Sequence, residues 1–272
     1  MIEKLYHYAH ALESRLFQLY ELALMRREGV DFSTDFRKKI WRNPGQTEDW
    51  VNLARFIKPS EKVILVDIGA NVGDFTADFL SIYKNGRAFC FEPVQATFDQ
   101  LTKKFSAEKR VVLERCGLGD VDGDAEIFLD EQSTLSSFCK YTDEANENYN
   151  VENVQVEKTP CRRLDGLAFN RNDERMLIKI DVQGFESEVI RGGMKTIQSA
   201  DAVLLECSFA EEYVGKEPSF SACCSLLQEC QLYPIAFQDF GRLLSNYAFE
   251  RDVLFVRRDL LQRIWFRNYE FN

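Results

Sequence analysis

Residues 62–93, KVILVDIGANVGDFTADFLSIYKNGRAFCFEP, decide the fold of this chain. They open with a continuous apolar run, 62–69, of the kind found in strands that are buried on both faces of a sheet. Residues 72–84 then carry apolar side chains at helical spacing, and residues 86–93 form a second strand-like run. A strand, a helix and a second strand in this order predict a parallel βαβ unit.

The same alternation continues through most of the chain. Further buried strands are expected at 110–119, 175–184 and 200–209, with helices at 95–105 and 186–198. Edge or additional strands are expected at 124–130 and 153–160, and an antiparallel final pair at 233–238 and 252–258, joined by a turn around Gly241. The pattern predicts an α/β fold: a doubly wound, mostly parallel sheet with helices on both faces.

Length and composition are those of an ordinary globular protein. The 272 residues, 45% of them hydrophobic, suffice for one large domain with an appendage. No apolar run reaches the roughly 18 residues that span a bilayer. The N-terminus also lacks the basic-then-apolar layout of a signal peptide. We therefore expect a cytoplasmic protein.

Charge and cysteine content exclude several classes of function. The net charge of −10 argues against general nucleic-acid binding, and the acidic excess lies after residue 60, which favours acceptors that are not strongly anionic. The eight cysteines include no C-x-x-C pair and several sit in apolar runs, so we expect buried, reduced thiols. His7 and His10 are the only histidines, so few ligands are available for a Cys/His metal site.

Residues 1–58 are expected to form an N-terminal helical extension, and 59–272 the main domain, with Pro59-Ser60 as the boundary. Apolar residues recur at alternating steps of three and four through the helix expected at 2–25. This helix either docks on its own domain or makes a homodimer.

The carboxyl ends of the expected strands carry the candidate site, because ligands of doubly wound sheets bind there. The first such turn, VDIGANVG, has Gly69 and Gly73, which permit a tight turn before a helix N-terminus. A dinucleotide fingerprint would have glycine at 71, where this chain has Asn71. The carboxylate of Asp67 would repel a pyrophosphate but suits the amine and sulfonium of S-adenosylmethionine.

Two further strand ends add to the adenosine interpretation. Glu92 ends the second strand, where a carboxylate receives the ribose hydroxyls of an adenosine cofactor; it is alternatively a helix N-terminal acid beside Pro93. Glycines 117 and 119 leave a flat wall on which an adenine could lie, although a simple turn explains them equally.

Five segments together resemble the FkbM-type family of S-adenosylmethionine-dependent methyltransferases. They are VDIGANVG (66–73), FCFEP (89–93), CGLGDVDG (116–123), TPCRRLDGL (159–167) and IKIDVQGFESEVIRGG (178–193). The resemblance covers roughly residues 60 to 260. It implies a class I methyltransferase (Rossmann-like) fold with a seven-stranded sheet whose last strand is antiparallel, and O-methylation of a sugar or polyketide-type hydroxyl.

On this resemblance we expect a set of residues to surround the cofactor. They are Asp67, Gly69, Ala70, Asn71, Gly73, Glu92, Pro93, Gly117, Leu118 and Asp181. The family pattern K-x-D-x-E-G-x-E is matched by this chain except at one position, where Gln183 stands for the glutamate.

Transfer of a methyl group to an alcohol requires alignment of the reactants and removal of the hydroxyl proton. Both histidines lie in the N-terminal segment, so the candidate catalytic residues are Asp181, Lys179 and Glu206. We expect Asp181 to be the base, with turn formation or helix capping as its alternative role. Glu206 could bind a substrate hydroxyl or be an ion-paired structural acid, and Lys179 could pair with it.

The amide at Gln183 bears on metal use, since hard cations prefer carboxylates. We expect a metal-independent enzyme, although an amide would still serve if the position binds substrate hydroxyls. The acidic connection 131–152 could form a lid whose Ser133, Ser136 and Ser137 bind a polyol, or be a solvated loop.

The sequence thus predicts an O-methyltransferase that acts on a hydroxyl of a carbohydrate, glycan or secondary metabolite. Two alternatives remain at this point. A non-catalytic binding or scaffold protein is suggested by Gln183 and the heptad helix. An NAD-dependent oxidoreductase is disfavoured by Asp67 and Asn71.

Overall fold

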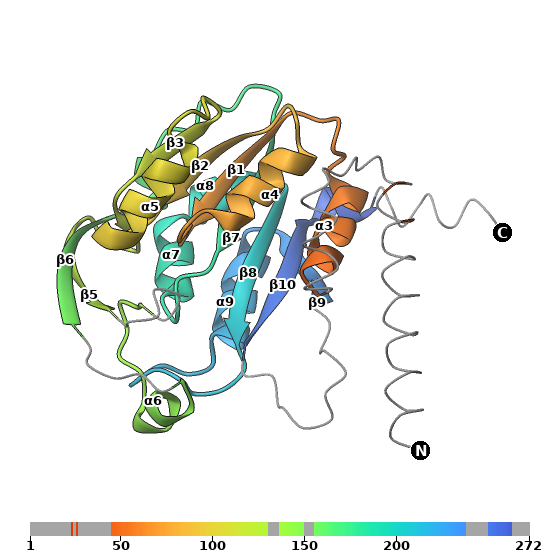
Figure 1. Ribbon diagram of the computed structural model, residues 1–272. Coiled ribbons are helices and arrows are strands. Elements are labelled where there is room, and N and C mark those ends of the chain that lie inside the picture. The colour runs from red at the N-terminus through yellow and green to blue at the C-terminus, as the bar shows by residue number, and fades with distance from the viewer. Residues whose placement is uncertain are drawn as a thin grey trace, which may run out of the picture.

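The computed structural model describes residues 45–129, 136–149, 155–237 and 250–262, with residues 23 and 26 (Figure 1). Its centre is a seven-stranded sheet in the order β3-β2-β1-β7-β8-β10-β9. The strands are β1 (Val63–Ile68), β2 (Arg87–Phe91), β3 (Val111–Glu114), β7 (Arg175–Ile180), β8 (Ala202–Ser208), β9 (Leu232–Phe237) and β10 (Glu250–Arg257). Strand β10 runs antiparallel to β8 and β9, and the other pairs are parallel. The predicted fold class is confirmed.

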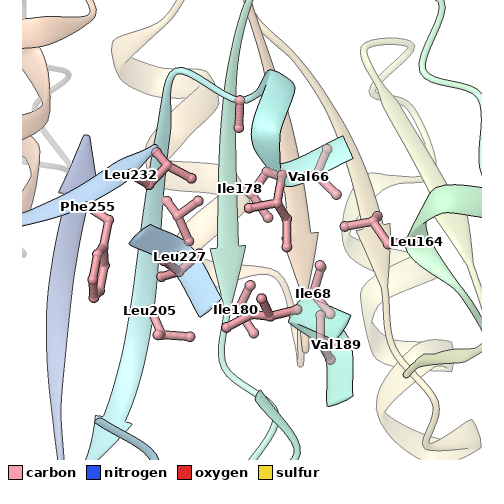
Figure 2. Packing of buried hydrophobic residues seen from close by; sticks show 14 of the residues in the cluster. Val66, Ile68, Leu164, Ile178, Ile180, Val189, Leu205, Leu227, Leu232 and Phe255 are labelled. Atoms are coloured by element: carbon pink, nitrogen blue, oxygen red, sulfur yellow. The ribbon is translucent and has the colours of Figure 1, made fainter. Parts of the chain in front are cut away.

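Helices cover both faces of this sheet (Figure 1). On one face lie α3 (Gly45–Phe56), α4 (Asp74–Ile82) and α5 (Gln95–Phe105), and on the other α7 (Glu186–Gly192), α8 (Met194–Ser199) and α9 (Ser219–Glu229). Strand β1 is buried throughout, and its alternate side chains enter different cores: Leu65 packs with the first group of helices, and Val66 with the second. Figure 2 shows Val66 and Ile178 in the second core, together with Val189 and Leu227.

A second, small sheet lies beside the main one in the order β4-β6-β5, made of β4 (Gly117–Leu118), β5 (Gly123–Leu129) and β6 (Gln155–Arg162). The single strand expected at 110–119 is therefore wrong. After Glu114 the chain turns, with Cys116 N donating to Glu114 O at 3.2 Å, and Gly117 pairs with Cys161 instead. The turn places Gly117 against the Phe138 ring, 2.4 Å from where a Cβ would stand.

Two further segments differ from expectation. The helix expected at 186–198 is divided into α7 and α8 at Gly193, where the side chain of Leu164, from the short 3₁₀ helix Leu164–Gly166, occupies the place of a Cβ. The connection 131–152 contains a helix, α6 (Asp143–Tyr149).

Helix α3 packs into the core that also holds β1 and β10. Trp50, Leu53 and Ile57 are buried there, and the Tyr83 hydroxyl donates to Ile57 O at 3.0 Å. The division into 1–58 and 59–272 stays a prediction. Apart from residue 23, the homodimer helix 2–25 lies outside the described residues, and so does the turn around Gly241.

Two compositional expectations can be compared with the described residues. All eight cysteines are free, and all but the half-buried Cys224 are buried, which confirms the expectation of reduced thiols. In the portion of the chain that the structure describes, no helix has the length and apolar character needed to cross a bilayer.

Asp201, just before β8, anchors the amino-terminal edge of the sheet. Its fully buried carboxylate contacts three guanidinium groups, from Arg171 at 2.5 Å, Arg175 at 3.0 Å and Arg257 at 3.1 Å, and accepts the backbone N–H of Met176 at 2.9 Å. If the carboxylate were removed, the three guanidinium groups would keep their positive charges, and the Met176 N–H would lose its acceptor.

We expect Asp201→Ala to lower the free energy of unfolding by about 3 kcal/mol, because breaking such a network leaves like charges together and a buried donor unsatisfied. The matched control is Asp259→Ala. The side chain of Asp259 is 48% exposed and pairs with Arg257, so its loss should lower the free energy of unfolding by less than about 1 kcal/mol. Urea denaturation of both variants measures the difference. Equal losses in the two variants would contradict the prediction.

Candidate active site

The candidate site lies where the strand order reverses, at the carboxyl ends of β1 and β7. The chain runs outward from β1 to β2 and β3 on one side, and from β7 to β8 on the other. Open α/β sheets bind ligands in the crevice that this reversal leaves. A cavity is present there, and the sequence-predicted residues that line it are Gly69, Asn71, Glu92, Pro93, Gly117, Leu118, Asp181 and Glu206. Asp67, Ala70, Gly73 and Lys179 do not line it.

The turn after β1 brings two strand ends into direct contact. Gly69 has φ +78°, and a Cβ there would stand 1.8 Å from the carbonyl oxygen of Asp181. Its N–H and that of Ala70 donate to Phe91 O, each at 3.0 Å. Because only glycine allows this approach, the turn remains narrow and its backbone borders the cavity.

Asp67 faces away from the cavity, toward α4. Thr76 Oγ1 donates to its Oδ2 at 2.6 Å, whereas its buried Oδ1 has no hydrogen-bond partner among the described residues. Burial raises the pKa of Asp67, and the Lys179 ammonium and the Thr76 bond oppose this rise. The alternation of β1 explains its direction, since Leu65, two residues earlier, packs on the same face.

Glu92 lies on the cavity wall at the end of β2. One carboxylate oxygen accepts the N–H of Asn71 at 2.9 Å and the other that of Val94 at 3.0 Å, so the side chain joins the first two βα turns. It is only 6% exposed. Burial raises its pKa to about 7, against the lowering effect of the two backbone bonds. This carboxyl therefore changes charge near neutral pH.

Asp181 is held on both of its carboxylate oxygens. Lys179 Nζ is 2.8 Å from Oδ2, and Gln183 Nε2 donates to Oδ1 at 3.1 Å. The prediction that Lys179 could pair with Glu206 is thus wrong: residues 179 and 181 are two apart on an extended chain and share a face. Desolvation acts to raise the pKa of Asp181, but Lys179 and the side-chain hydrogen bonds outweigh it and hold that pKa below its usual value.

Glu206, at the end of β8, differs from Asp181 in the direction of its pKa shift. Desolvation and the nearby carboxylates of Asp181 and Glu250 raise its pKa well above the ordinary value. A protonated Glu206 is a hydrogen-bond partner of Asp181, and it also accepts Gln183 Nε2 at 2.6 Å. The two acids thus differ in the direction of their pKa: that of Asp181 lies below the ordinary value, and that of Glu206 lies well above it.

The backbone N–H groups of the turn after β7 donate hydrogen bonds to Glu186 and not to Asp181. Glu186 is 3% exposed, and its Oε1 accepts the N–H groups of Gly184 at 2.9 Å and Val182 at 3.4 Å. Burial raises its pKa to about 7. The hydrogen bonds described for the Asp181 carboxylate come from side chains. The capping role considered for Asp181 therefore belongs to Glu186.

A roof over this turn comes from two loops. Tyr141 and Tyr213 form an isolated antiparallel β-bridge, with ring centroids 4.7 Å apart, and both hydroxyls point at Gln183 Oε1, at 3.2 and 3.5 Å. Ser137, which is 1% exposed, donates to the backbone oxygen of Gln183 rather than facing the cavity. Tyr141, Tyr213 and Ser137, which we call the roof, thus hold both the side chain and the backbone of Gln183.

Some residues near this turn were predicted from the sequence, and others were not. Ser136 lines the cavity, as does Phe138, which sequence reasoning did not single out. Ser133 lies outside the described residues. Neither tyrosine was predicted, because no local pattern distinguishes a loop tyrosine that reaches a site.

The fold is that of class I, Rossmann-like methyltransferases, and this cavity lies at the carboxyl ends of β1, β2 and β7. Residues 67–232 match the model of the methyltransferase FkbM domain, and the chain belongs to that family. It is a methyltransferase whose cofactor is S-adenosylmethionine.

Several curated proteins are similar to this chain. The 2-O-methyltransferase NoeI of Sinorhizobium fredii is 28% identical over 167 residues, which cover 57% of this chain and 67% of that protein. The hexuronic acid methyltransferase AglP of Haloferax volcanii is 26% identical over 178 residues, covering 64% and 69%. Methyltransferase 1 of Beauveria bassiana is 29% identical over 142 residues, covering 47% and 57%.

Among solved structures, the methyltransferase FkbM of Methylobacillus flagellatus superposes with a TM-score of 0.45. It is 14% identical, and the superposition covers 72% of this chain and 44% of that one.

The residues present fit the cofactor. Gly69 gives a narrow backbone edge, Glu92 a carboxylate on the wall that suits hydroxyl donors, and Leu118 with the Phe138 ring an apolar wall. The flat glycine wall expected at 117 and 119 is wrong, because the rings of Phe138 and Phe185 cover these two glycines. Bound there, S-adenosylmethionine supplies an activated methyl group on a sulfonium. The wall residues are acidic or neutral, as a cationic ligand requires.

Proposed function

We propose that this protein is an O-methyltransferase that acts on a hydroxyl group of a carbohydrate or a similar polyhydroxyl acceptor. The observation that carries the proposal is the ionised Asp181, fixed between Lys179 and Gln183 on the cavity wall beside the turn at Gly69. A carboxylate held in this way can orient an acceptor hydroxyl and take its proton as the new bond to oxygen forms.

The neighbouring residues support this role in different ways. The Lys179 ammonium favours the charged form of Asp181, so the carboxylate is ready to accept a hydrogen bond. Phe138 on the roof side of the cavity supplies apolar cover that limits water. Glu206, in its protonated form, can donate a hydrogen bond to an acceptor oxygen without adding a second negative charge.

The charge of the cavity supports an uncharged acceptor. The acidic residues that line it are Glu92, Asp181 and Glu206, and among the described residues no lysine or arginine lines it. Two relatives are named for 2-O-methylation and for a hexuronic acid, which supports a sugar-like acceptor here. An acceptor carboxylate would meet repulsion from Asp181, so we place neutral sugars ahead of uronic acids.

Cofactor preference can be tested first, without knowledge of the acceptor. S-adenosylhomocysteine at a hundredfold excess over its dissociation constant should stabilise the protein by about 2.7 kcal/mol, with a matching rise in melting temperature, whereas NAD⁺ should not. A shift with NAD⁺ but not with S-adenosylhomocysteine would instead support an oxidoreductase.

The acceptor can then be identified by transfer of a radiolabelled methyl group onto lysate fractions. We expect label in carbohydrate-containing material that resists mild alkali, as an ether does and an ester does not. Label confined to alkali-labile esters, protein or nucleic acid would contradict the proposal. The cytoplasmic location, the homodimer and the absence of nucleic-acid partners rest on the sequence and stay predictions.

A further inference from the structure

We propose that the side-chain amide of Gln183 takes the place of a cation between Asp181 and Glu206, so that a glutamate at this position would create a divalent-cation site. The role of Gln183 in catalysis rests on the proposed function, whereas the test of cation binding described below does not depend on it. Gln183 is then a positioning residue that lets Asp181 work without a metal ion.

The amide nitrogen is placed as a bridging cation would be. Gln183 Nε2 donates to Asp181 Oδ1 at 3.1 Å and to Glu206 Oε2 at 2.6 Å, so both of its hydrogens are directed at carboxyl oxygens. Lys179 Nζ occupies the other oxygen of Asp181 at 2.8 Å. The donors together prevent rotation of the Asp181 carboxylate.

The orientation of the amide is set from the opposite side. Gln183 Oε1 accepts from the hydroxyls of Tyr141 and Tyr213. Reversing the amide would set its oxygen against the two carboxyl groups, so the tyrosines and the acids select the same orientation. The backbone is held as well, since Gln183 has φ +53° and its carbonyl oxygen accepts from Ser137.

A glutamate here would have nearly the same shape but the opposite electrostatic effect. Its second oxygen would replace a donor between two carboxyl groups, and three acids would then share one small space. Such a cluster is stabilised either by protons or by a hard divalent cation, for which three carboxyl groups are a preferred ligand set. In the part of the chain that the structure describes, no group of three or more Asp, Glu, His or Cys side chains is placed to hold a metal ion.

The test compares Mn²⁺ binding by isothermal titration calorimetry in full-length wild-type protein, Gln183→Glu, Gln183→Ala and the double variant Gln183→Glu/Asp181→Asn. We expect Gln183→Glu to bind Mn²⁺ at least about tenfold more tightly than wild type and Gln183→Ala, and the double variant to lose this gain. Gln183→Ala removes the amide without adding a carboxylate, so it separates the two effects.

Two results would overturn the proposal. One is wild-type protein that binds Mn²⁺ as tightly as Gln183→Glu. The other is a Gln183→Glu protein that still binds S-adenosylhomocysteine, and is therefore folded, yet gains no affinity for Mn²⁺. Failure of the proposed function would show differently, as absent S-adenosylhomocysteine binding or absent methyl transfer in the wild-type protein.

Discussion

Replacing Asp181 by asparagine is expected to slow methyl transfer by about 10²- to 10⁴-fold, the range that a positioned general base contributes. Asparagine keeps the size of the side chain and the backbone contact with Gly69, but it cannot accept the hydroxyl proton. It also leaves the Lys179 ammonium, which is 8% exposed, without its carboxylate. The rate should therefore fall more than the affinity for S-adenosylhomocysteine.

Single-turnover transfer to the identified acceptor measures this loss. The matched control is Asp252→Asn, which removes a carboxyl group that interacts with Asp181 and Lys179 but does not line the cavity. It should retain most of the wild-type rate. An Asp181→Asn enzyme within a few-fold of wild type would show that Asp181 is not the base.

Replacing Glu92 by glutamine is expected to weaken binding of S-adenosylhomocysteine by about 10- to 100-fold, since hydrogen bonds to a charged group contribute roughly 1.5–3 kcal/mol. The pKa of about 7 adds a pH dependence. The ionised carboxyl is the better acceptor for hydroxyl donors, so wild-type affinity should rise about tenfold from pH 6 to pH 8, as the charged fraction grows. Glu92→Gln should lose this rise.

Glu186→Gln is the control for that experiment. The pKa of Glu186 is also raised to about 7 by burial, but its side chain does not line the cavity, so cofactor affinity should keep its pH dependence in this variant. If the affinity of wild-type protein were flat from pH 6 to pH 8, or if Glu92→Gln kept the rise, Glu92 would not be the titrating group that contacts the cofactor.

Both glutamates also link stability to pH, with a definite sign. Their folded-state pKa values, near 7, lie above the ordinary value of 4.5. Each carboxyl therefore contributes stability that is fully present below its ordinary pKa and is lost as pH rises through about 7. The two glutamine variants should each flatten the fall in stability between these limits.

The sheet and the edge that carries the site could be predicted because they follow from simple periodicity. Continuous apolar runs marked the strands that are buried on both faces, and each acid placed just after such a run lies at the same edge of the sheet. The direction of Asp67 toward α4 was also available in principle, from its alternation with Val66 and Ile68.

Contacts between distant loops could not be predicted in the same way. Tyr141 and Tyr213 meet over Gln183, but neither lies in a periodic segment, and the turn between β3 and β4 depends on a Phe138 ring from another connection. Gln183 itself was recognised only as a departure from a pattern. The four hydrogen bonds of its side chain depend on residues from three other parts of the chain, which no local pattern brings together.

Strand β10 belongs to the folded sheet but lies outside the segment that matches the family. The segment shared with the family ends at residue 232, whereas β10 begins at Glu250 and lies between β8 and β9. A fragment trimmed to the shared segment would lose that strand, leave an open edge on β8 and discard the α3 residues that cover the sheet. Expression fragments should therefore follow the tertiary structure and retain at least residues 45–262.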